Sequence, residues 1–324
     1  MLKLGLWLGF AVLLCLLPLL LNQYLLSVLI LIVFFAYLGE SWNIIGGYAG
    51  QLSLGHSAFF GLGAYTSTVL FLKFGITPWV GMFAGGILSL IAGLITGFLT
   101  FKYSLRGAYF ALATLAFAEI LRLLSINWMW IGGAVGLLIP GKENYWLFLS
   151  SSKLFFYYII LIMLVIVTLI TFVIENSRLG FYLIAIREDE QAANSLGINT
   201  FKYKLVATAI SAFFTGLGGT FYAQYLLYID PNIVFGSYLS VDILLRPIIG
   251  GSGTLWGPLV GACVLGPLSE LTRVFFGNIM GLHLMIYGAT LILVILFIPS
   301  GIAGIISRSW GYLALRLLDK ERRP

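Results

Sequence analysis

The densest run of polar side chains in this chain extends from Arg187 to Lys204 and reads R-E-D-E-Q-A-A-N-S-L-G-I-N-T-F-K-Y-K. Three acids open it at residues 188–190, where they would suit the positive end of a helix dipole. Gly197 suits the end of such a helix, because glycine adopts a left-handed backbone at little cost. We therefore expect a short helix of about two to three turns from Glu188 to Leu196.

The chemistry that this segment offers is recognition by another protein rather than catalysis. Ala192, Ala193 and Leu196 would give the expected helix one small, mildly apolar face that a second protein could approach closely. The plainer alternative is an ordinary loop helix surrounded by solvent. The residues of the segment alone leave both interpretations open.

Residue types that carry catalysis are few and scattered. His56 and His283 are isolated, and no His, Cys and carboxylate residues fall at metal-ligand spacing, so we expect neither a metal site nor a catalytic centre. Cys15 and Cys263 lie in apolar runs, where packing is the simpler role. The sequence has no glycine-rich loop ending in Gly-Lys-Ser/Thr, so we expect no ATP hydrolysis and no cofactor in this chain.

Charged residues inside apolar segments are further candidates, since ionisable groups within a bilayer usually have a function. Glu119 and Arg122 are three residues apart and can face each other on one helix, which predicts a structural ion pair near the outer end of a span. The alternative with a direct function is that the carboxylate couples transport to protons, as in an ion-coupled secondary transporter. Glu40, Asp242 and Glu270 are the other acids of this kind, and each lies toward an expected span end or a motif.

The elements that must position these residues are expected to be membrane-spanning helices. Of the 324 residues, 60% are hydrophobic and 9% are charged, and the mean hydropathy of +1.04 is far from that of a soluble domain. Several apolar runs exceed the ~18–20 residues that cross a bilayer as a helix. We therefore predict an all-α polytopic membrane protein in which residues 1–324 form a single transmembrane domain.

About ten apolar runs are present, at roughly residues 4–21, 25–45, 52–72, 79–100, 107–124, 154–174, 204–228, 237–250, 256–275 and 282–300. With ten spans and a cytoplasmic N-terminus, most of the 18 basic residues lie on the cytoplasmic side, in agreement with the positive-inside rule. This arrangement predicts that both termini, the loop at about 175–203 and the basic tail at about 301–324 are cytoplasmic. Because topology explains the formal charge of +6, we expect no nucleic-acid partner.

Two glycine-rich interruptions break the apolar pattern, at residues 46–56 and at residues 250–258. Their similar placement in the two halves suits a transporter whose broken helices meet near the membrane midplane. Close helix packing through small residues is the alternative. The residues expected to line a translocation path at the first interruption are Gly50, Gln51, Ser53, Gly55, His56, Ser57 and Thr114.

Four motifs resemble those of one transporter family. The spacing E-x-A-A-x-x-x-G at 190–197 resembles the coupling-helix loop of permease subunits in ABC importers, and the inserted Gln191 is typical of LivM-type permeases for branched-chain amino acids. Residues 47–61 and 105–111 are similar to two further motifs of these permeases, and residues 132–137 resemble a fourth, although Ile131 stands where Thr is usual. The motifs occur in family order along nearly the whole chain.

This resemblance implies how the chain would work. It would be the permease subunit of an ATP-driven importer, with a LivH-type second permease, two ATP-binding subunits and an external substrate-binding protein, in the inner membrane of a prokaryote. Its coupling helix would dock on an ATPase, and the resemblance assigns Glu190, Ala192, Ala193 and Gly197 to that helix. Related permeases carry urea, other amides or sugars, so the resemblance indicates the class of transporter more firmly than the substrate.

Overall fold

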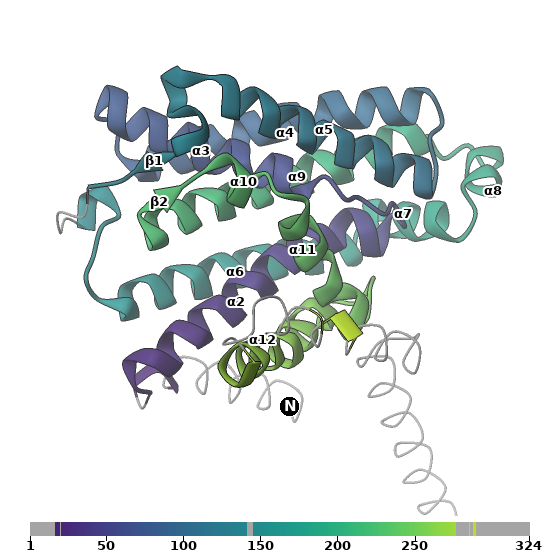
Figure 1. Cartoon of the computed structure of the whole chain (residues 1–324). Coiled ribbons are helices and arrows are strands. Elements are labelled where there is room, and N and C mark those ends of the chain that lie inside the picture. The colour runs from purple at the N-terminus through teal and green to yellow at the C-terminus, as the bar shows by residue number, and fades with distance from the viewer. Residues whose placement is uncertain (1–16, 20, 141–144, 277–284, 286–287, 290–324) are drawn as a thin grey trace, which may run out of the picture.

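The computed structural model describes residues 17–19, 21–140, 145–276, 285, 288 and 289, and within them the chain is almost entirely helical (Figure 1). The long helices are α2 (Gln23–Asn43), α3 (His56–Phe74), α4 (Pro78–Lys102), α5 (Ala108–Asn127), α6 (Lys153–Glu175), α7 (Arg178–Glu188), α9 (Thr200–Leu226), α11 (Ser237–Gly250) and α12 (Gly257–Phe276). The short elements are the π-turn η1 (Ile44–Tyr48), the 3-10 turns η2 (Met129–Ile131), η3 (Gly133–Val135) and η4 (Tyr145–Leu147), helices α8 (Glu190–Ser195) and α10 (Pro231–Val234), and strands β1 (Leu137–Leu138) and β2 (Tyr228–Ile229).

The apolar runs of the sequence correspond to helices wherever the chain is described. Among the described residues, six segments are long and apolar enough to cross a bilayer, namely Gln23–Tyr48, Pro78–Lys102, Ala108–Asn127, Lys153–Glu175, Thr200–Leu226 and Pro231–Gly250. Helices α3 and α12 occupy two further expected spans. The expected spans at about 4–21 and 282–300, and the basic tail, lie almost wholly outside the described residues.

The helices form two packed groups. In the first, α3, α4 and α9 pack against one another and α5 lies along α3. In the second, α2 packs against α6, α11 and α12 (Figure 1). Helix α9 also contacts α2, so it joins the two groups.

Helix α4 has small residues on its inward face and large apolar residues on its outward face, as is common in membrane proteins. Its inward face is made of small residues such as Gly85, Ser89 and Gly93, which are buried against α3 and α9. Its large side chains face outward, and Phe83 is 59% exposed and Ile87 54% exposed. Small residues let helix backbones approach closely in lipid, where burying large apolar side chains gives no special gain. The pattern indicates that the outward face of α4 is a lipid contact.

The end of the molecule opposite α8 is closed by the connection between α5 and α6. Strand β1 of this connection pairs antiparallel with β2, so the connection is tied to the end of α9 (Figure 1). Trp79 stacks on Phe148 with ring centroids 4.3 Å apart, while Trp128, Trp130 and Trp146 are exposed. Exposed tryptophans at one end of a helix bundle are typical of a membrane–water boundary.

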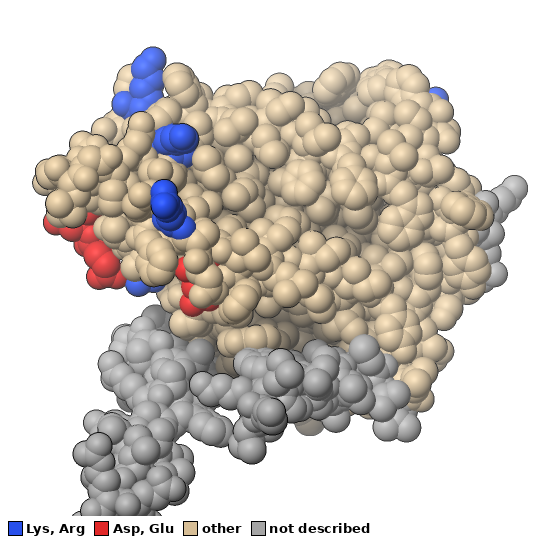
Figure 2. Space-filling model, turned by 180° about the vertical axis from the view of Figure 1, so that it is seen from behind, with Lys and Arg blue, Asp and Glu red and all other residues tan. Residues whose placement is uncertain are grey.

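Charged side chains gather at the other end. On the face shown in Figure 2, Lys, Arg, Asp and Glu cluster around the end that carries α8, and the broad middle of the described surface is free of them. A middle zone free of charged side chains is expected of a chain that crosses a bilayer, because charges there are costly.

Several expected boundaries are shifted by a few residues, and two of the shifts concern the polar segments. The short helix begins at Glu190 rather than Glu188, because Glu188 ends α7 and Asp189 takes an extended conformation between the two helices. The third expected span begins at His56 rather than near residue 52, because residues 49–55 are not helical.

Candidate functional site

The loop from α7 to α9 is ordered around a capped helix. The Asp189 carboxylate Oδ1 accepts hydrogen bonds from the backbone N–H groups of Gln191 (2.8 Å) and Ala192 (3.0 Å), which caps the N-terminus of α8. These donors, that of Ala192 foremost, hold the pKa of the Asp189 carboxyl below its ordinary value. Gly197 follows α8 with a φ of +84°, so the predicted glycine stop is confirmed.

Glu190 anchors α8 to the rest of the protein. One carboxylate oxygen, Oε1, pairs with Lys204 Nζ, and the other lies 3.1 Å from Arg106 Nε. The Lys204 side chain is only 2% exposed and its ammonium lies 4.7 Å from the centroid of the Phe101 ring. A buried lysine needs a paired carboxylate to keep its charge. Glu190 therefore fixes α8 to α9 and to the loop that follows α4.

A polar hollow of about 530 Å³ lies beside this anchor, between the C-terminal end of α4, the 103–107 loop, α8 and the start of α9. Lys102, Arg106, Glu190 and Lys204 bring three basic groups and one acid to its wall. The charges in this hollow are at the same end as α8, where Figure 2 shows the charged side chains. The hollow could accept a polar surface of another protein.

The structure buries one residue of the expected docking face of α8 and leaves the other two exposed. Ala192 is exposed and Leu196 is 82% exposed, so both can be approached from outside. Ala193, by contrast, is 2% exposed and packs inward. The surface that α8 offers to a partner is therefore made by Ala192 and Leu196, and Ala193 supports it from beneath.

The two glycine-rich interruptions lie against each other. Asn43, the last residue of α2, donates a hydrogen bond from Nδ2 to the carbonyl of Thr254 (3.0 Å) and accepts one at Oδ1 from the Gly253 N–H (2.8 Å). A side chain at Gly47 or at Gly253 would collide with the backbone of the other loop. Residues more than two hundred positions apart thus form one contact, and both loops leave their helices there.

Arg187 reaches this contact from α7. Its Nη1 donates a hydrogen bond to the carbonyl of Gly47 at 3.1 Å, and Glu188 pairs with the same guanidinium. Because α7 ends one residue later, the guanidinium connects the segment that leads into α8 with both glycine-rich loops. Sequence analysis missed Arg187 and Asn43 as site residues, since their partners are remote along the chain.

The predicted path residues lie together but are enclosed. His56 is 1% exposed, with Nδ1 3.1 Å from Ser53 Oγ and Nε2 2.8 Å from Ser211 Oγ. Ser211 in turn donates to the carbonyl of Ser41 (2.7 Å), and the Trp42 indole donates to the carbonyl of Ser53 (2.8 Å). The imidazole therefore connects the first glycine-rich loop with α9.

The remaining predicted path residues are placed close to this group. Gln51 is 9% exposed and donates from Nε2 to the Ala49 carbonyl at 3.1 Å. Ser57 accepts at Oγ from Ser240 at 2.9 Å, and Thr114 accepts at Oγ1 from the Leu54 N–H at 3.1 Å. Gly55 is buried against the Thr114 backbone, while Gly50 is exposed.

Among the described residues, three ion pairs lie within single expected spans, and one of them, between Arg273 and Glu270 of α12, is largely exposed on the arginine side. The Arg122 guanidinium binds Glu119 through Nε (2.9 Å) and Nη2 (2.6 Å), and Nη1 donates to Asn232 Oδ1 at 2.6 Å. The predicted structural pair is therefore confirmed. A second pair, which the sequence analysis missed, joins Arg246 Nη1 to Asp242 Oδ1 at 2.5 Å on α11. The four-residue spacing of these charges within one span was the signal that could have found it.

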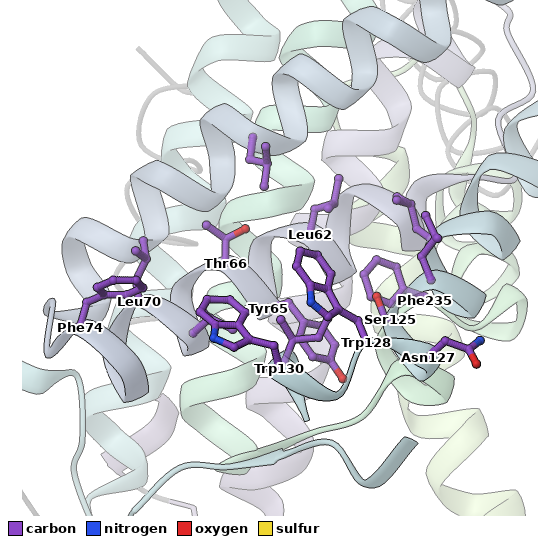
Figure 3. A pocket seen from close by; sticks show the side chains of 15 residues that line it. Leu62, Tyr65, Thr66, Leu70, Phe74, Ser125, Asn127, Trp128, Trp130 and Phe235 are labelled. Carbon is purple, nitrogen blue, oxygen red and sulfur yellow. The ribbon is translucent and has the colours of Figure 1, made fainter. Parts of the chain in front are cut away.

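An apolar groove of about 650 Å³ lies near the end opposite α8, between α3 and the end of α5. Figure 3 shows Trp128 and Trp130 lying over Leu62, Tyr65 and Thr66 of α3. Its walls offer few polar atoms, so the groove suits hydrocarbon better than a polar solute. Across the described part of the chain, no group of three or more His, Cys, Asp or Glu residues could hold a metal ion.

Comparison with known proteins agrees with this architecture. Residues 24–295 match the family described as "Branched-chain amino acid transport system / permease component". The chain is 31% identical over 289 residues to the high-affinity branched-chain amino acid transport system permease protein LivM of Salmonella typhimurium, covering 82% of this chain and 66% of that protein. The LivM protein of Escherichia coli K12 is 30% identical over 309 residues, which is 88% of this chain and 71% of the relative.

A second type of permease matches more weakly. LivH of Salmonella typhimurium is 24% identical over 284 residues, covering 83% of this chain and 91% of that protein. No solved structure matches the chain significantly. The extent of the family match and the two LivM alignments show that the chain belongs to the permease-component family of branched-chain amino acid transport systems.

Proposed function

We propose that the chain is the permease subunit of an ATP-driven ABC importer that translocates branched-chain amino acids delivered by an external binding protein. The observation that carries this proposal is the family match over residues 24–295, together with the two LivM relatives, which are named for that transport system. Because the chain spans about two thirds of the length of the Salmonella relative, substrate and partners are part of the proposal.

The proposed assembly contains this chain, a LivH-type second permease and two ATP-binding subunits in the inner membrane of a prokaryote. ATP is bound by the partner subunits, and this chain contributes neither a catalytic residue nor a cofactor site. Residues 1–324 form one transmembrane domain of about ten spans with both termini in the cytoplasm. A reporter fused after Pro324 should be active only inside the cell, and activity only outside would refute this topology.

The coupling helix of the proposed importer is α8. Three features support this role: the Asp189 cap, the exposed Ala192 and Leu196, and the anchor of Glu190 on Lys204. A helix held this firmly transmits a push from a partner instead of bending away from it. Motion of α8 would pass through Arg187 to the glycine-rich loops that lie beside the predicted path.

The proposed path runs along the first glycine-rich loop, at Gly50–Ser57, and past Thr114. Non-helical backbone at membrane depth must be covered by protein or by water in a cavity, and here protein covers residues 53–57 and Gln51 while Gly50 and Leu52 are exposed. Transport by alternating access would expose this stretch when α8 is displaced. Such a change would act on the hydrogen bonds that His56 makes to Ser53 and Ser211.

Reconstitution of the four kinds of subunit in vesicles tests the function. Leucine uptake should require ATP and binding protein and should persist when a protonophore removes the proton gradient. The variant E119Q should keep that uptake, since Glu119 is a structural partner of Arg122. Uptake that follows an ion gradient without ATP would instead show a secondary transporter. Uptake of urea or an amide in place of leucine would contradict the proposal that the substrate is a branched-chain amino acid.

A further inference from the structure

A small cavity of about 80 Å³ lies between α2, α11 and α12, and charged side chains line it. Asp242 and Arg246 of α11 face it, as do Ser269 and Glu270 of α12. Charges inside a bilayer are expensive and mark functional sites by default. The site is separate from the stretch Gly50–Ser57, because none of those residues lines it.

Arg246 is the residue that points to a ligand. It is 2% exposed, its Nη1 is held by Asp242, and its guanidinium stacks at 3.8 Å from the centroid of the Phe35 ring. The buried Nε has no hydrogen-bond partner among the described residues. A buried, unpaired donor of a charged group is costly, and the Nε side of a guanidinium is an edge that binds a carboxylate through two parallel hydrogen bonds.

The wall of the cavity carries both signs of charge. Among the residues that line the cavity, Arg246 is the cation, and Asp242 and Glu270 are the carboxylates. Glu270 is oriented by a hydrogen bond from the Tyr24 hydroxyl and by Arg273 Nη2 at 2.6 Å. Asp242 is paired with Arg246 and Glu270 with Arg273, so the charges balance, and a group with adjacent carboxylate and ammonium meets a partner for each of its charges without adding net charge. The charge arrangement therefore fits a zwitterion.

The apolar part of the wall fits the rest of such a ligand. Leu31 and Ile32 of α2 line the cavity next to Phe35, in the middle of a 21-residue helix. About 80 Å³ is the room of roughly two to three water molecules, which suffices for the charged head of an amino acid. A branched aliphatic side chain would extend along Leu31 and Ile32 once α12 moves from α2.

We propose that this cavity is a membrane-embedded site for the zwitterionic head of an aliphatic α-amino acid. Arg246 Nε receives the α-carboxylate, and Asp242 with Glu270 receives the α-ammonium. The proposal rests on the proposed function, since it locates a transit site for the amino acid that the importer carries. It adds selection by head group within the membrane to any selection made outside by a binding protein.

The test uses the reconstituted assembly with C15A, C263A and S269C in this chain, which leaves every charged residue in place. Aminoethyl methanethiosulfonate, a small cationic thiol reagent, should modify residue 269. L-leucine at about ten times its Kd should slow that reaction about tenfold by mass action. Leucinamide, which lacks the carboxylate, and the α-keto acid of leucine, which lacks the ammonium, should give no protection.

A matched control and a second variant sharpen the result. A cysteine at the exposed Ser151, in the same C15A and C263A background, should react at the same rate with and without leucine. Adding R246K to the S269C protein keeps the charge but removes the planar fork, and should weaken protection about tenfold or more. If R246K does not fold, the comparison of the three ligands on the S269C protein still tests the proposed site.

Failures of the two proposals can be told apart, because leucine uptake is measured in the same vesicles. The zwitterion site would be wrong if leucine uptake occurred without protection of residue 269, or if leucinamide protected as well as leucine. Neither result would contradict the proposed importer. No reaction in any state would also overturn the zwitterion site, since a site that admits leucine should admit a reagent of similar size that carries the same ammonium group. Protection by leucine without uptake would overturn the importer and leave the site.

Discussion

Arg187 donates a hydrogen bond from Nη1 to the carbonyl oxygen of Gly47 at 3.1 Å, across 140 positions of sequence. The same guanidinium lies so close to Gly253 that a methyl group there would collide with it. One side chain at the end of α7 therefore contacts both glycine-rich loops. Arg187 therefore lies between α8, which begins three residues later, and the point where α2 ends and the 251–256 loop follows α11.

Gly50 should be intolerant of a side chain for a steric reason that Gly75 does not share. Both have a φ of +66°, but a Cβ at Gly50 would lie 2.6 Å from Arg187 Cγ, whereas nothing lies within 4 Å at Gly75. The left-handed backbone alone should cost G75A about 1–2 kcal/mol of unfolding free energy. We expect G50A to cost at least about 1 kcal/mol more, because the Arg187 contact becomes overpacked.

Denaturation of the purified variants, followed by tryptophan fluorescence, measures both changes. The matched φ makes G75A the control for backbone strain. Equal losses in the two variants would show that Arg187 is not packed against the loop.

Removing the charge of Glu190 should destabilise the protein through Lys204. In E190Q the buried ammonium loses its carboxylate, which should cost about 3 kcal/mol of unfolding free energy. The control R106Q removes the other, half-exposed partner of Glu190 and should cost less than about 1 kcal/mol. Thermal unfolding in detergent gives the comparison.

A second substitution checks the physical reason. The double variant E190Q/K204M removes both charges and should recover much of the loss, because no unpaired cation is left buried. If the double variant is as unstable as E190Q, the Lys204 charge is not the cause.

Ala192 is the position where a bulky side chain should uncouple transport without unfolding the permease. A192W places an indole on the exposed side of α8, so the protein should insert and fold normally while ATP-driven leucine uptake falls at least about tenfold. A193W is a different case, because Ala193 is buried and the indole would disrupt the packing of α8 itself. Normal uptake by A192W would count against α8 as the coupling helix.

The buried state of the predicted path residues gives a conformational test. Single cysteines at Gln51, Ser53 and Ser57 should be nearly inert toward a water-soluble thiol reagent in the conformation described here, since all three positions are at most 9% exposed. At least one should become reactive when the ATPase subunits are trapped with ATP. If all three stay inert in both conditions, the stretch serves helix packing and the path lies elsewhere.

Features set by neighbouring residues could be predicted from the sequence. The apolar runs predict the helices because the bilayer demands length and hydrophobicity. Gly197 ends the loop helix as expected, and Glu119 binds Arg122, because both depend on residues within one helical turn. The start of α8 was missed by two residues, since three acids in a row do not reveal which of them, Asp189, takes the extended cap conformation.

Features that depend on remote residues were decided by the tertiary structure. The sequence indicated polar atoms at Ser53 and His56, but only the packing of α9 against the glycine-rich loop showed that Ser211 binds the imidazole. Likewise, Ala193 is buried on a helix that the pairing of Glu190 with Lys204 holds against α9, a contact that its own segment does not reveal. Periodicity and spacing describe what a segment can form by itself, whereas these partners lie up to 155 positions away and are chosen by how the helices pack.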